Sequence, residues 1–72
     1  MQVVEDEEFS GSDTGFVTAV VTGDATLEAR SAAATWVAVP DGAVSDTVFT
    51  FHAPVGSVWR FTSMTGTVML FS

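Results

Sequence analysis

The chain has 72 residues and no cysteine, and nine Asp and Glu against two Arg give it a net charge of −7 at pH 7. A chain of this length is one domain and buries only about 60% of its unfolded surface, so it usually needs a disulfide, a metal or a partner subunit. The lack of cysteine excludes a disulfide, and a single His without Cys cannot complete a zinc site. Oligomerisation or an unusually efficient core therefore remains as the source of its stability.

The acidic charge narrows the range of partners. Nucleic acid and anionic membrane surfaces both attract clustered cations, and Arg30 and Arg60 are the only two here. No stretch approaches the ~18 apolar residues that a membrane-spanning helix needs. The acidic N-terminus also lacks the basic start of a signal peptide. We therefore expect no direct contact with nucleic acid or membrane, and no export by a signal peptide.

Residues 1–15 differ in composition from the rest of the chain. Residues 5–8 are four consecutive carboxylates, and a polar run at residues 10–13 follows Phe9. Adjacent like charges repel each other and stay hydrated, which predicts an extended acidic N-terminal arm over residues 1–15. Phe9 is the expected anchor of this arm on a partner. Removing residues 1–9 should then abolish attachment and leave the rest folded.

Residues 16–72 have the pattern of β-structure throughout. Runs of β-branched and aromatic residues are separated by Gly, Pro and Asp, which is typical of strands joined by turns. Turns are expected at residues 23–24 and 40–42, since Gly, Pro and Asp favour turn conformations. The expected strands are residues 16–22, 25–30, 35–39, 46–52, 57–63 and 66–72, with residues 2–4 as a seventh candidate. We predict an all-β fold, a small antiparallel β-sandwich or barrel of six to seven short strands.

Two of these strands carry large apolar side chains on both faces. In residues 48–51 and again in residues 68–71, apolar groups alternate to both sides of the strand. A strand in an isolated sandwich has one solvated face, so a neighbouring chain is expected to cover the second one, and we expect a homo-oligomer. The predicted interface residues are Phe9, Phe49, Phe51, Trp59, Arg60, Met69 and Phe71.

No pattern points to catalysis, and we predict no enzyme activity, no cofactor and no metal. His52 has no nucleophile motif beside it, so we interpret it as a structural or interface residue. Carboxylates at residues 5–8 alternate sides along an extended chain and do not converge on calcium. Trp36 and Trp59 lie inside strands, where packing is favoured over stacking on a sugar ring.

Five stretches resemble small β-sandwich proteins encoded among the structural genes of tailed bacteriophages. They are residues 25–30 (ATLEAR), 35–42 (TWVAVPDG), 48–51 (VFTF), 54–61 (PVGSVWRF) and 66–70 (GTVML). The resemblance covers residues 16–72 and leaves out the acidic segment. It implies a virion protein: a capsid cement or decoration subunit, or a small head, neck or tail-fibre module.

From this resemblance we expect a subunit that bridges shell proteins and stabilises them, in contact with the major capsid protein or another virion protein. Two alternatives stay open. One is a tail- or fibre-associated module that binds host-surface glycan through Trp36 or Trp59. The other is an acidic inhibitor that mimics DNA; it ranks last, because mimicry needs evenly spread carboxylates and four of the nine crowd into residues 5–8.

Overall fold

The computed structural model describes all 72 residues, of which 64% lie in strands and none in a helix. It therefore contains no helix that could span a membrane. Six antiparallel strands make up one sheet: β1 (Gln2–Val3), β2 (Phe9–Ser10), β3 (Phe16–Arg30), β4 (Trp36–His52), β5 (Val58–Thr62) and β6 (Thr67–Phe71). The prediction of an all-β antiparallel fold is confirmed.

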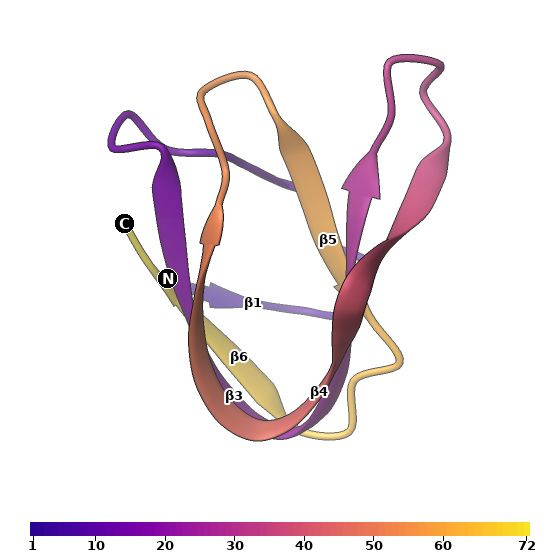
Figure 1. The fold of residues 1–72 in the computed structure, drawn as a ribbon. Helices are drawn as coiled ribbons and strands as arrows, with labels where there is room; N and C mark the ends of the chain where they lie inside the picture. Colours follow the sequence, from indigo (N-terminus) through magenta and orange to yellow (C-terminus); the bar gives the residue numbers. More distant parts are fainter.

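The long β3–β4 hairpin organises the sheet. β4 pairs with β3 along its length, while the other side of β3 pairs first with β6 and then with β5. The hairpin curves back on itself in a U, so the sheet forms a half-barrel (Figure 1). We call residues 16–22 of β3, residues 47–52 of β4, β6 and β1 the first limb. Residues 24–30 of β3, residues 36–45 of β4, β5 and β2 form the second limb.

The strands are longer than the sequence predicted, because the expected turn at residues 23–24 is a bulge. β3 continues through it, and two β3 residues, Thr22 and Gly23, lie opposite Asp46 alone. Gly23 has a φ of 80° and Asp46 a φ of 45°. The backbone N–H of Gly23 donates to Asp46 Oδ1 at 2.8 Å, which holds the bend of the U in place. A bulge increases strand twist and bend without ending the pairing.

The expected turn at residues 40–42 is a second bulge. Residues 39–42 of β4 lie opposite Leu27 of β3, and pairing resumes on both sides. Asp41 takes a φ of 57°, in the left-handed region that Asp tolerates better than most residues. The prediction of six to seven short strands is therefore wrong in one respect: two predicted pairs of strands fuse into β3, with 15 residues, and β4, with 17.

The N-terminal residues pack on the sheet. Gln2 of β1 pairs with Met69, and Phe9 of β2 pairs with Trp59. Residues 4–8 cross from one limb to the other behind the U (Figure 1), and all five are exposed. The acidic run is thus a hydrated crossing between two short strands, where an extended arm was expected.

The core lies between the two limbs and contains no buried polar side chain. Its largest fully buried side chains, at less than 2% exposure, are Phe61, Leu27, Val3 and Val68. The ring of Phe9 stacks on Phe61 with centroids 5.9 Å apart. The domain boundary expected after residue 15 therefore separates segments that share one core.

Candidate interaction surface

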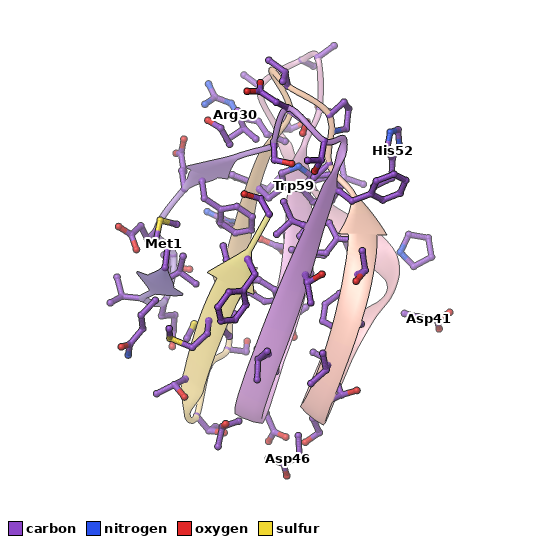
Figure 2. All side chains as sticks on the ribbon, turned by 90° about the vertical axis from the view of Figure 1, so that its left-hand side faces the viewer. Met1, Arg30, Asp41, Asp46, His52 and Trp59 are labelled. Atoms are coloured by element: carbon purple, nitrogen blue, oxygen red, sulfur yellow. The ribbon has the colours of Figure 1, made fainter.

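The outer face of the first limb combines large apolar side chains with uncharged threonines. Cross-strand pairing aligns Phe16 with His52, Val20 with Val48 and Met69, and Thr18 with Thr50 and Phe71. Because alternate strand residues point to opposite faces, all of these side chains project away from the core. Figure 2 looks onto this face, with His52 at its upper edge and Asp46 below it.

Three large side chains on this face are mainly in solvent: Phe16 is 54% exposed, Val48 63% and Phe71 54%. Val20 and Met69 between them are half-buried. At the centre the hydroxyls of Thr18 and Thr50 share one hydrogen bond at 2.8 Å. The paired positions include no carboxylate, Lys or Arg, although the chain as a whole is strongly acidic.

The outer face of the second limb has the opposite character and holds both cations. Arg60 Nε donates to Glu28 Oε1 at 2.8 Å, and its guanidinium lies 4.2 Å from the ring centroid of Trp36. Arg30 pairs with Glu8 at 3.4 Å. Arg60 therefore pairs with a carboxylate of its own chain, and one face of the Trp36 ring is occupied by a cation.

The concave side of the sheet holds the other aromatic residues named from the sequence. Phe49 and Phe51 face inward, 5.7 Å apart, and Phe51 lies 5.0 Å from Trp59. The indole N–H of Trp59 donates to Ser57 Oγ at 2.7 Å. These three side chains pack against the core but stay half-buried.

The predicted interface residues therefore do not form one surface. Phe9 is 7% exposed in the chain's own core, so little of its ring is left for the expected contact with a partner. Met69 and Phe71 lie on the outer face of the first limb, where the structure adds Phe16, Val20 and Val48. Alternation along residues 16–22 places Phe16 and Val20 on one face, but only the pairing of Val20 with Val48 adds the third residue. Contact of this surface with a partner stays a prediction.

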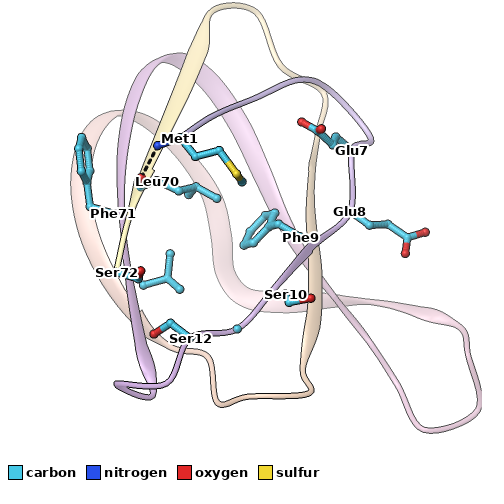
Figure 3. Close-up of a pocket in the computed structure, with 11 residues that line it drawn as sticks. Met1, Glu7, Glu8, Phe9, Ser10, Ser12, Leu70, Phe71 and Ser72 are labelled. Carbon is cyan, nitrogen blue, oxygen red and sulfur yellow. Dashed lines mark hydrogen bonds between the residues drawn. The ribbon is translucent and has the colours of Figure 1, made fainter.

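A hollow of about 340 Å³ opens between the N-terminal segment and the end of β6 (Figure 3). Its apolar lining comes from Met1, Phe9, Val17, Leu70 and Phe71, and the N-terminal amine donates to the Leu70 carbonyl at 2.8 Å. Glu8 points away from it. Glu7 and Ser72 also border the hollow, which is an open gap at the margin of the sheet.

Neither metal ligands nor a catalytic constellation come together. No three His, Asp or Glu side chains are placed to hold a metal ion. His52 is exposed, with its ring 5.5 Å from that of Phe16. Comparisons with protein-family models, curated proteins and solved structures find no match.

Proposed function

We propose that this chain is a structural subunit of a tailed-phage virion, a capsid cement or decoration protein that docks on shell proteins through the outer face of its first limb. The phage assignment rests on the sequence resemblance in residues 16–72. The exposed apolar face centred on Thr18 and Thr50 supports a docking role, and it is the single observation that carries that role.

Burial of this face offers a sufficient driving force. Complete burial of a Phe or Val side chain contributes about 1.5–3 kcal/mol. Phe16, Val48 and Phe71 keep more than half of their surface exposed, so each still has about half of that contribution to give to a partner. Since the paired positions of this face include no carboxylate, Lys or Arg, a partner can cover it without desolvating an ion pair.

The glycan alternative gains no support from the two Trp residues. Arg60 covers one face of Trp36, and Trp59 packs against Phe51.

The DNA-mimic alternative gains no support from the placement of the carboxylates. Glu5, Asp6, Glu7 and Glu8 lie together on one crossing, and Glu28 pairs with Arg60. This spacing differs from the regular charges of a DNA backbone.

The replacement Phe71→Lys tests the docking face. It places a charge in the apolar surface, and the side chain is already 54% exposed, so the fold should persist. Loss of a central interface aromatic costs about 2 kcal/mol or more, which is roughly thirtyfold in Kd. We expect binding to shells assembled from the major capsid protein of the encoding phage to fall by at least this factor in a co-sedimentation titration.

The matched control is Ala38→Lys, which adds the same charge at an exposed residue on the outer face of the second limb. It should bind shells as the unmodified chain does. Equal occupancy for Phe71→Lys and the unmodified chain, or no binding of the unmodified chain to any virion component, would overturn the proposal.

A further inference from the structure

β4 is an edge strand whose two halves differ in protection. It pairs with β3 on one side and with no strand on the other. Pro, a charged residue or a bulge usually prevents an edge strand from pairing with another chain. Residues 36–45 have all three in the bulge at Pro40 and Asp41, and Asp41 projects beyond the ribbon in Figure 2. Residues 47–52 (TVFTFH) have none of these features.

The hydrogen-bonding pattern shows which backbone groups this open half presents. Ala53 N–H donates to the Gly15 carbonyl at 2.7 Å, so these two residues form a hydrogen-bonded pair of the ladder. Hydrogen-bonded pairs alternate along antiparallel strands, so Phe49 and Phe51 also bond to β3. The N–H and C=O groups of Val48, Thr50 and His52 therefore point outward, and no hydrogen bond in the structure satisfies them.

We propose that residues 47–52 of β4 pair antiparallel with the same residues of a second copy, about a two-fold axis at Thr50. Outward-pointing residues must face one another for a ladder to form. Only the register that sets Thr50 opposite Thr50 of the partner subunit, and Val48 opposite His52 of the partner subunit, uses all the free groups. Each facing pair exchanges two backbone hydrogen bonds.

Side chains are compatible with this register on both faces. On the concave side Phe49 falls opposite Phe51 of the partner subunit, which would cover two aromatic rings that are half-buried in the single chain. On the outer side the two Thr50 side chains meet. The two His52 side chains are kept apart, since each lies opposite a Val48.

The distribution of charge leaves this edge open to a second copy. Two chains of net charge −7 repel each other wherever their acidic surfaces meet. Residues 47–52 include no carboxylate, and the four carboxylates of residues 5–8 lie on the crossing between β1 and β2, whereas β4 pairs only with β3. The joined sheets would carry both first limbs side by side, with their outer apolar faces continuous. This pairing does not depend on the proposed shell-binding function.

Charge exchange at position 50 tests the two-fold register. Sedimentation equilibrium of the unmodified chain should give a mass rising with concentration toward twice 7.5 kDa. In Thr50→Lys and in Thr50→Glu, like charges would face each other, and association should weaken at least tenfold. An equimolar mixture of the two variants should recover it.

Two controls separate this effect from side effects. Thr50→Val removes the hydroxyl bond to Thr18 but adds no charge, and should still dimerise. Phe71→Lys alters the docking face and leaves the edge intact, so it too should dimerise even where it no longer binds shells. Dimerisation through the edge of β4 and binding to shells through the docking face can therefore be lost independently of each other.

The absence of cysteine offers a second measurement. Thr50→Cys, as the only thiol in the chain, should form a disulfide-linked dimer under mild oxidation, because facing residues of paired strands lie within disulfide range. Thr62→Cys, on the second limb, should not. A mass of 7.5 kDa at all concentrations, or dimers that persist equally in Thr50→Lys and Thr50→Glu, would overturn the proposal.

Discussion

Replacing Phe9 with alanine is expected to lower the free energy of unfolding by about 3–5 kcal/mol. Phe9 is 7% exposed, stacks on Phe61 and meets Phe51 edge-on at 6.5 Å. Its removal leaves a cavity between the limbs that the short strand β2 cannot close. A domain of this size has about 4–11 kcal/mol of stability in total, so this change would remove a large part of it.

Urea unfolding followed by Trp fluorescence measures this loss. The matched control is Val4→Ala, which shortens a side chain that is 62% exposed on the same segment, and it should shift the midpoint little.

Deletion of residues 1–9 should unfold the chain, because both Val3 and Phe9 would leave the core. This prediction is the opposite of the expectation from sequence, in which the truncated chain stays folded. A truncated chain with the unfolding midpoint of the full chain would show that the N-terminal segment adds nothing to the core.

The substitution Gly66→Val is expected to destabilise the chain by about 3 kcal/mol, the upper end of the range for overpacking. Gly66 precedes β6 and lies directly over the Thr22 carbonyl of β3, so any Cβ would overlap that oxygen. The obstructing atoms belong to the backbone, and Gly23 of the bulge adjoins them. A larger residue must therefore push β6 away from the bend of the U.

Calorimetry is the direct measurement for this variant. A loss of this size should lower Tm by more than about 10 °C in a chain of 60–100 residues. Thr67→Val is the matched control, since residue 67 is exposed and its side chain lies on the outer face. A Gly66→Val variant with the same Tm as the control would mean that β6 can shift at little cost in stability.

The all-β fold was predictable because period-two alternation depends only on the residues of each strand. The two bulges were not, because Gly23-Asp24 and Pro40-Asp41-Gly42 suit a turn and a bulge equally well. What decides between them is whether the flanking runs pair with each other. Here they pair with strands from elsewhere in the chain, an outcome that no local window of sequence contains.

The sequence predicts that some strands carry apolar side chains on both faces, but it does not predict which of these faces is exposed. Alternation showed that Val48 and Phe49 point to opposite faces, but only the curl of the sheet decides that Val48 faces solvent. The burial of Phe9 was unpredictable for a related reason. Four neighbouring carboxylates indicate a hydrated segment, yet they do not prevent the residues flanking them from packing inward.

The pairing of β1 with β6 sets the order in which the molecule can be completed. β1 has no partner until residues 68 and 69 are available, so Val3 cannot be buried before β6 is present. Contacts between such distant residues carry a large loop-closure cost and slow folding. During synthesis β1 can pair only after β6 has emerged, whereas β2 needs only β5.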